Sequence, residues 1–210
     1  MNTFANFALC ALLAVPALAR AQAPSTPAPL KDRPAETFNE IERGFYVAVL
    51  GGPSFVVNPP AASGPRPFSS GQTGTVELGI DLGERLSLGL FIMGASNRVG
   101  ADYVGNSGGT ASGDFSTLVP GAVLRAHLVG FADSQEVKRT FIYARGGAGY
   151  ALFSPKQLLP DSDILVFAGP GVEYYTRLRH FSVGLELTGN YLVKSGSFGF
   201  AVTPNLRYAF

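Results

Sequence analysis

The last thirteen residues of the chain, 198–210, alternate between large apolar side chains and small or polar ones. The large set occupies every second position: Phe198, Phe200, Val202, Pro204, Leu206, Tyr208 and Phe210. Successive side chains of a β-strand leave opposite faces, so this period of two predicts a strand. One apolar face and one face of small or polar groups suit a strand between lipid and a polar barrel lumen. The alternative is an edge strand of a soluble β-sandwich.

Similar alternation recurs in seven earlier segments. In 71–83, for example, Val76 and Leu78 fall on one face of the strand and Glu77 falls on the other. The eight candidate strands are 44–57, 71–83, 86–96, 113–128, 138–153, 163–177, 181–194 and 198–210. Each reaches the roughly 9–11 residues that a tilted strand needs to cross a bilayer. The pattern therefore predicts an all-β fold, an eight-stranded antiparallel up-and-down transmembrane β-barrel.

The lengths of the connections test this topology, because an even number of strands places both chain ends on the periplasmic side. The expected outer loops have 13, 16, 9 and 3 residues, at 58–70, 97–112, 154–162 and 195–197. The expected periplasmic turns have 2, 9 and 3 residues, at 84–85, 129–137 and 178–180. Transmembrane barrels have long outer loops and short periplasmic turns, so only the last loop and the 129–137 turn depart from the pattern.

Three of the predicted strands contain a proline at a similar distance from their periplasmic ends: Pro120, Pro170 and Pro204. Proline lacks the N–H that a sheet ladder needs, and it is normally confined to edge strands or bulges. We therefore expect local bulges at these three positions.

The N-terminal end predicts export. A short apolar stretch at 7–15 is followed by small residues, with an A-x-A cleavage site at Ala19-Arg-Ala21. No Lys or Arg precedes the stretch, which departs from a standard signal peptide. We expect a signal peptide at 1–21, with cleavage after Ala19 as the alternative, and Cys10 would be removed with it. The proline-rich, charged segment 22–43 is expected to be a periplasmic lead-in, followed by the barrel at 44–210.

Composition narrows the class of protein further. The chain has 26 Gly and 16 Phe, but only 15% of its residues are charged. Beyond the signal peptide no apolar run reaches the roughly 18 residues of a transmembrane helix. The formal net charge of +1 offers no basic stripe, so nucleic acid is not expected as a partner.

Charged residues recur at positions that should face the lumen. The inward positions of the predicted strands hold Glu77, Asp81, Arg125, His127, Arg145, Glu173, Arg177, Glu186, Lys194 and Arg207. The lumen of an eight-stranded barrel is just wide enough to be filled by side chains. Acids and bases in so narrow a space should pair, because an isolated buried charge is costly. We interpret the set as a packed ion-pair plug, with a narrow pore or proton path as the alternative.

No enzyme, metal or cofactor site is expected. His180-Phe-Ser182, with Glu186 nearby, resembles the His-x-Ser element of barrel lipid A deacylases, but His180 falls at a periplasmic turn rather than near the outer leaflet. A nucleophile and its base must come within hydrogen-bond reach, and no serine is placed for this. Two separated histidines do not supply the three or four convergent ligands of a metal site. A lipid-modifying enzyme stays as an alternative function.

The ending Thr203-Pro-Asn-Leu-Arg-Tyr-Ala-Phe210 resembles the C-terminal strand of bacterial outer-membrane barrels. In that class the assembly machinery reads this strand, which implies that Leu206, Tyr208 and Phe210 form the assembly signal. The region 44–210 as a whole resembles small barrels of the OmpA-transmembrane or OmpX kind. The resemblance implies an outer-membrane location, with membrane lipid and the barrel-assembly machinery as partners.

A narrower resemblance involves four segments, 41–47, 51–60, 76–83 and 203–210, which are similar to adventurous-gliding-motility outer-membrane proteins of the CglE kind. This resemblance implies a non-enzymatic structural or interaction component of the cell envelope. Its partners would be periplasmic or outer-membrane motility proteins. A narrow channel is the alternative function.

Overall fold

A computed structural model of the chain describes residues 41–57, 69–104, 110–154 and 162–210. The expected signal peptide, nearly all of the lead-in, and most of the outer loops 58–70 and 154–162 lie outside the described residues. Within the described ranges, no helix is long and apolar enough to cross a membrane.

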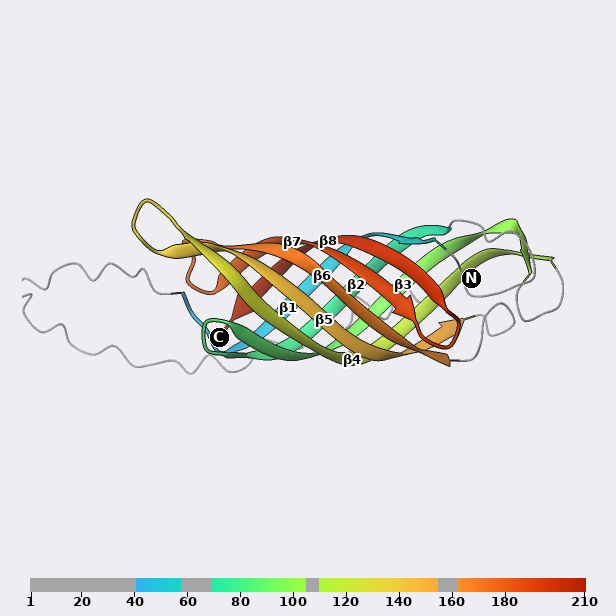
Figure 1. Ribbon diagram of the computed structural model, residues 1–210, viewed down its shortest axis with the longest axis horizontal. Coiled ribbons are helices and arrows are strands. Elements are labelled where there is room, and N and C mark those ends of the chain that lie inside the picture. The colour runs from blue at the N-terminus through green and yellow to red at the C-terminus, as the bar shows by residue number, and fades with distance from the viewer. Residues whose placement is uncertain (1–40, 58–68, 105–109, 155–161) are drawn as a thin grey trace, which may run out of the picture. The chain divides into compact units, whose positions relative to one another are not determined.

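Eight strands close into an antiparallel barrel in which each strand pairs with the next and the last pairs with the first (Figure 1). They are β1 (Phe45–Val56), β2 (Ser69–Leu82), β3 (Leu86–Val104), β4 (Thr110–Ala132), β5 (Lys138–Ser154), β6 (Ser162–Tyr175), β7 (Phe181–Leu192) and β8 (Ser197–Ala209). The predicted eight-stranded up-and-down barrel is confirmed. We call the end with the β2–β3, β4–β5 and β6–β7 connections the turn end, and the opposite end the loop end.

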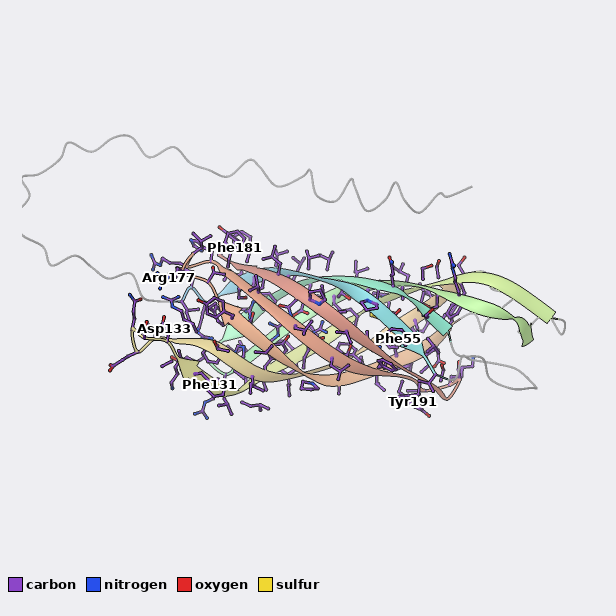
Figure 2. The ribbon with its side chains drawn as sticks, turned by 90° about the horizontal axis from the view of Figure 1, so that it is seen from above. Phe55, Phe131, Asp133, Arg177, Phe181 and Tyr191 are labelled. Carbon is purple, nitrogen blue, oxygen red and sulfur yellow. The ribbon has the colours of Figure 1, made fainter. Side chains whose placement is uncertain are left out.

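The alternation seen in the sequence sorts side chains between the lumen and the outer wall. In β8, Thr203, Asn205 and Arg207 are buried in the lumen, whereas Phe198 and Leu206 are about half exposed on the outer wall. The side chains that radiate from the wall are visible in Figure 2. The large apolar residues of β2 and β3 other than Phe91 and Met93 also point outward, with Leu90 being 69% exposed. An apolar outer wall around a filled interior is the arrangement of a barrel surrounded by lipid.

The hairpin of β3 and β4 is longer than the sequence predicts, so the expected 16-residue loop at 97–112 is wrong. β3 continues to Val104 and β4 begins at Thr110, and the two pair again beyond a register shift that lies between Val99 and Tyr103. This stretch is rich in Gly and Ser and lacks apolar alternation. Backbone hydrogen bonds do not need apolar side chains, so the pattern could not reveal these pairs.

The expected nine-residue turn at 129–137 is also wrong, because β4 runs on to Ala132. A register shift between His127 and Val129 marks a β-bulge, and both Leu128 and Val129 are exposed there. Two consecutive outward side chains break the period of two, which made the strand seem to end at Leu128.

The remaining turn, 133–137, is held by the carboxylate of Asp133. It accepts hydrogen bonds from the N–H groups of Gln135 and Val137 and from Nε of Arg139, at 2.8, 3.2 and 2.9 Å. The hydrogen bond from Gln135 is the main cause that lowers the pKa of Asp133, and the bonds from Val137 and Arg139 lower it further. The turn also holds Glu136 at a φ of 62°.

The expectation of bulges at the three prolines is wrong. The β4–β5 ladder pairs Leu118 with Leu152 and Gly121 with Gly149, so it omits the pairs at Val119 and Pro120 without a change of register. The β6–β7 ladder omits the pair at Pro170, and the β1–β8 ladder the pair at Pro204, in the same way. Each proline therefore lies at a local gap in one of its two neighbouring ladders, where no N–H is needed. The strand keeps its register across the gap.

Candidate functional site: the polar network in the lumen

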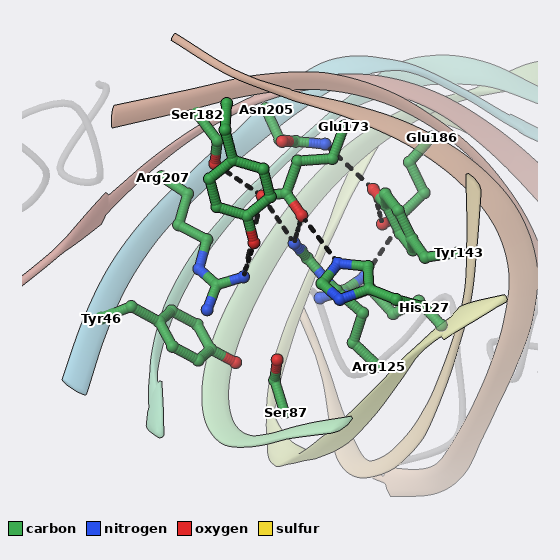
Figure 3. Close-up of polar contacts among 12 residues, drawn as sticks. Tyr46, Ser87, Arg125, His127, Tyr143, Glu173, Ser182, Glu186, Asn205 and Arg207 are labelled. Carbon is green, nitrogen blue, oxygen red and sulfur yellow. Dashed lines mark hydrogen bonds and ion pairs between the residues drawn. The ribbon is translucent and has the colours of Figure 1, made fainter. Parts of the chain in front are cut away.

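The interior of the barrel is divided into an apolar half and a polar half. Toward the loop end lies an apolar cluster of Phe91, Phe115, Val119, Val123, Ala151, Phe153, Leu165, Phe167 and Leu192. Toward the turn end lie the charged side chains that the alternation predicts to face inward. We call Glu77, Asp81, Arg125, His127, Arg145, Glu173, Glu186 and Arg207 the lumen network, because ion pairs join them in two groups, one around Arg145 and one around Glu173. Figure 3 shows Arg125, His127, Glu173 and Arg207 of the second group.

Arg145 on β5 joins two carboxylates from strands across the lumen. Its guanidinium donates to Glu77 on β2 at 2.7 Å and to Glu186 on β7 at 2.8 Å. Tyr46 donates to the other oxygen of Glu77 at 2.6 Å, and Tyr143 donates to the other oxygen of Glu186 at 3.1 Å. The three charged side chains are at most 5% exposed. This bridge therefore ties three non-neighbouring strands together through the interior.

Glu173 on β6 is the centre of a second group of contacts. Nη1 of Arg125 lies 3.2 Å from both carboxylate oxygens, and the hydroxyl of Ser182 donates to Oε1 at 2.6 Å. Arg207 approaches the same oxygen at 3.7 Å. Nε2 of His127 lies 3.1 Å from Oε2. A fully buried carboxylate with this many donors stays charged without an unpaired lone pair.

Arg207 on β8 links this group to the turn end of β2. Its guanidinium pairs with Asp81, which also accepts a hydrogen bond of 2.6 Å from the hydroxyl of Ser87. The guanidinium carbon lies 3.8 Å from the centre of the Tyr46 ring, and that of Arg125 lies 4.5 Å from the centre of Tyr143. Stacking on aromatic faces stabilises cations that have lost their water.

Both ring nitrogens of His127 lie close to an oxygen atom. Nδ1 lies 3.0 Å from the carbonyl oxygen of Glu84, and Nε2 faces the Glu173 carboxylate. The network has four carboxylates and three guanidiniums, and His127 joins it through its contact with the Glu173 carboxylate.

Arg177 does not join the network, in contrast to the expectation from the sequence. β6 ends at Tyr175, and Arg177 is exposed in the connection to β7 (Figure 2). Lys194 is likewise exposed, two residues after the end of β7 at Leu192. Alternation assigns a side to a residue only within a strand, and both predicted strands extended two residues too far.

The uncharged partners of the network were missed by the sequence reasoning. They are Tyr46, Ser87, Tyr143, Ser182 and Asn205, which lie on five different strands. The first four donate to carboxylates of the network, and Asn205 donates to the hydroxyl of Tyr143. All five occupy inward positions of predicted strands. The same alternation could therefore have found them if polar and aromatic residues had been considered together with the charges.

His180 and Ser182 do not form a catalytic pair. Ser182 is buried and donates to Glu173, whereas His180 bonds the carbonyl oxygen of Ala209 through Nδ1 and stacks on Tyr208. Ser182, Glu173 and His127 do lie in one row, but the carboxylate stands between the hydroxyl and the imidazole. A nucleophilic serine needs direct contact with its base. In the described part of the chain, no group of three or more His, Cys, Asp and Glu side chains is placed to hold a metal ion.

The predicted assembly signal lies on the outer wall at the turn end. Leu206 and Phe210 are 49% and 58% exposed, and Tyr208 packs edge-to-face against Phe210 and Phe181. The backbone N–H of Phe210 donates to the carbonyl of Phe45, so the final residue takes part in closing the barrel.

Residues just before β1 cross the turn end of the lumen. The guanidinium of Arg43 lies 5.5 Å from the ring centres of both Phe141 and Tyr175 and donates to the carbonyl of Glu84 at 3.2 Å. The N–H of Glu42 bonds the carbonyl of Arg179 at 3.1 Å. The turn end is therefore covered by the chain itself.

No protein-family profile and no curated protein sequence matches the chain. Among solved structures, Neisserial surface protein A (NspA) is similar over 81% of this chain and 100% of its own, with 15% identity and a TM-score of 0.60. OprG from Pseudomonas aeruginosa matches over 82% of this chain and 99% of its own, with 11% identity and a TM-score of 0.49. For Ail, the attachment invasion locus protein of Yersinia pestis, these values are 80%, 99%, 14% and 0.41.

At 15% identity, the likeness to NspA shows the fold and nothing finer. The narrower resemblance to gliding-motility proteins gains no support from these comparisons. The chain has the closed, eight-stranded antiparallel architecture of the small outer-membrane β-barrels.

Proposed function

We propose that this protein is a non-enzymatic barrel of the outer membrane that acts as a structural or interaction component of the cell envelope. The observation that carries the proposal is that the lumen is closed by two different kinds of packing. The ion-pair network occupies the half at the turn end, and the aromatic and aliphatic cluster lines the half at the loop end beside a cavity of about 70 Å³. If the interior side chains serve to stabilise the barrel wall, the outer surfaces are the parts of the protein that bind partners.

The space between the two halves supports this proposal. The cavity that touches both Arg145 and Phe167 has a volume of about 20 Å³, which is room for about one water molecule. An ion that entered from the loop end would leave a cavity of about 70 Å³ beside Phe115 and Phe153 and would then have to pass Phe91 and Phe167 without its water, which is costly. The channel alternative therefore requires the core to open.

Within this class, we propose a role in a gliding-motility apparatus, with periplasmic or outer-membrane motility proteins as partners. Its only support is the resemblance of the four sequence segments given above. The test is single-cell gliding of the source bacterium after deletion of the gene. Normal gliding would remove this finer role and leave the envelope barrel in place.

The closed barrel is tested with the full chain, folded in liposomes and fused to a planar bilayer. We expect an unboiled band with shifted mobility on SDS gels, which reports a folded barrel, together with no steady unit conductance. Regular conductance steps from a preparation with that gel shift would overturn the structural proposal in favour of a channel. Envelope lipids are compared in cells that carry the wild type or Ser182→Ala. A difference in lipid acylation between them would favour the enzyme alternative.

A further inference from the structure

The hairpin of β4 and β5 extends past the rest of the barrel at the turn end (Figure 1). The last residue of β4 that pairs with β3 is Ala126, opposite Leu86, and β4 continues to Ala132. The N–H of His127 still reaches the carbonyl of Arg85. Beyond that bond, no strand among the described residues pairs with the β3-facing side of 128–132. We call this side the free β4 edge.

The free β4 edge lies on the water side of the membrane boundary. Glu84 and Arg85, in the β2–β3 turn, are exposed and level with His127. Charged side chains at this level exclude hydrocarbon, so residues 128–132 project into the aqueous compartment. Phe131 and Asp133 lie at this end of the barrel in Figure 2. We therefore place the edge in the aqueous compartment, where none of the described residues pairs with it.

The residues along this edge carry neither a charge nor a proline, which are two of the features that protect a strand edge. The β4–β5 register shifts at both ends of the segment, between His127 and Val129 and between Phe131 and Ala132. The segment 128–132 reads Leu-Val-Gly-Phe-Ala, without a charge or a proline. Leu128, Val129 and Phe131 are 64%, 50% and 50% exposed on the outward face. Natural proteins guard free edges with charged residues, proline or a covering element, because unpaired N–H and C=O groups recruit further strands. An uncharged edge matches an uncharged, apolar extended segment, since a charged segment would lose water without gaining a counter-ion.

We propose that the free β4 edge binds an extended, apolar segment of another protein on the periplasmic side, which adds to the barrel wall as one more strand. Strand addition of this kind gains affinity from backbone hydrogen bonds and specificity from alternate side chains. The inference rests on the proposed function as an interaction barrel, and it places the partner site on the hairpin rather than on the outer loops or the lead-in.

A second copy of this chain does not fit the edge. Two barrels with the same orientation in one membrane are related by an axis along the membrane normal. Around such an axis, the two copies of β4 would meet in parallel orientation. They would cross at twice the angle by which β4 is tilted from the membrane normal. Antiparallel edge pairing would require one barrel to be inverted in the membrane.

Amide hydrogen exchange tests the proposal, because an added strand protects backbone N–H groups. Outer-membrane vesicles from the native cell are compared with the purified full chain in liposomes. We expect the peptide that contains 128–132 to exchange at least tenfold more slowly in the native vesicles. Phe131→Lys should remove this protection, and Val129→Lys should act in the same way. Ser134→Lys, which places the same charge at the hairpin tip, should preserve it.

Three outcomes would overturn the inference. Equal exchange in vesicles and liposomes would mean that water alone satisfies the edge. Protection that rises with the density of the purified barrel in liposomes would identify a second copy as the occupant. Protection that survives both lysine variants on β4 would place the contact elsewhere. The gel shift is recorded for each variant, so that loss of folding is not mistaken for loss of binding. Conductance is measured in a separate experiment. If the barrel conducts and residues 128–132 are still protected from exchange, the proposal of a closed lumen is contradicted and the proposal of strand addition stands.

Discussion

Replacing Arg145 with methionine should destabilise the barrel far more than any surface change. The variant keeps a long side chain but leaves the carboxylates of Glu77 and Glu186 without the cation that lies 2.7 and 2.8 Å from them. Both carboxylates are at most 1% exposed, so water cannot take the place of the guanidinium. Removing one partner of a buried ion pair typically costs about 3–5 kcal/mol. With a urea dependence of about 2 kcal/mol per molar, the unfolding midpoint should fall by about 2 M.

The assay is the fraction of heat-shifted band on unboiled gels after equilibration in urea with liposomes. Arg177→Met is the matched control, because Arg177 is exposed and its loss should change stability by less than about 0.5 kcal/mol. The triple variant Glu77→Gln, Arg145→Met and Glu186→Gln should return to within about 1 kcal/mol of the wild type. The two glutamine side chains are neutral, and their amide oxygens can still accept hydrogen bonds from the hydroxyls of Tyr46 and Tyr143.

The reasoning would be refuted if Arg145→Met and Arg177→Met gave the same unfolding midpoint. That result would mean that the lumen is wet enough to solvate the two carboxylates. A triple variant as unstable as Arg145→Met would show instead that the bridge acts through its shape and not through charge balance.

Three further predictions concern single positions. Gly169→Ala should lower stability by about 1–3 kcal/mol, because its Cβ would lie 1.8 Å from the carbonyl oxygen of Leu187; Gly94→Ala, which meets nothing within 4 Å, should be close to neutral in the same urea assay. The lowered pKa of Asp133 means that the turn 133–137 gains stability above about pH 4 and loses it as the pH falls through the lowered value, so proteolysis of the turn should accelerate in acid. In Asp133→Asn that acid-dependent step should be absent, and its persistence would contradict the assignment. Deleting Phe210 should reduce the assembled, heat-shifted fraction in cells while leaving the protein able to refold in detergent, and unchanged assembly would argue against the terminal signal.

The outer wall and the inner charges could be predicted from the sequence because both depend on one local rule. Within a strand, neighbouring side chains point to opposite sides, so the apolar positions of β8 identify Arg207 as a lumen residue without any knowledge of its partners. The rule fails where the backbone departs from it. The bulge at Leu128 and Val129 concealed the end of β4, and the strand ends placed Arg177 and Lys194 on the wrong side.

The partners within the network could not be predicted in this way. Arg145 contacts Glu77 and Glu186, which lie 68 and 41 positions away in the chain. These contacts cross the lumen between strands that are not neighbours in the sheet. They depend on the closure and stagger of all eight strands, which the alternation within one strand does not specify.

The sequence by itself determined that this chain forms strands, that the strands are apolar on one face, and that charges occupy the other. Those properties follow from the period of two and from the difference between lipid and lumen as environments for a side chain. Only the tertiary structure decided which charges meet, that the lumen has an apolar half and a polar half, and that β4 runs past the end of its pairing with β3. Each of these depends on the register between strands, and register is set by the packing and hydrogen bonding of the whole closed sheet.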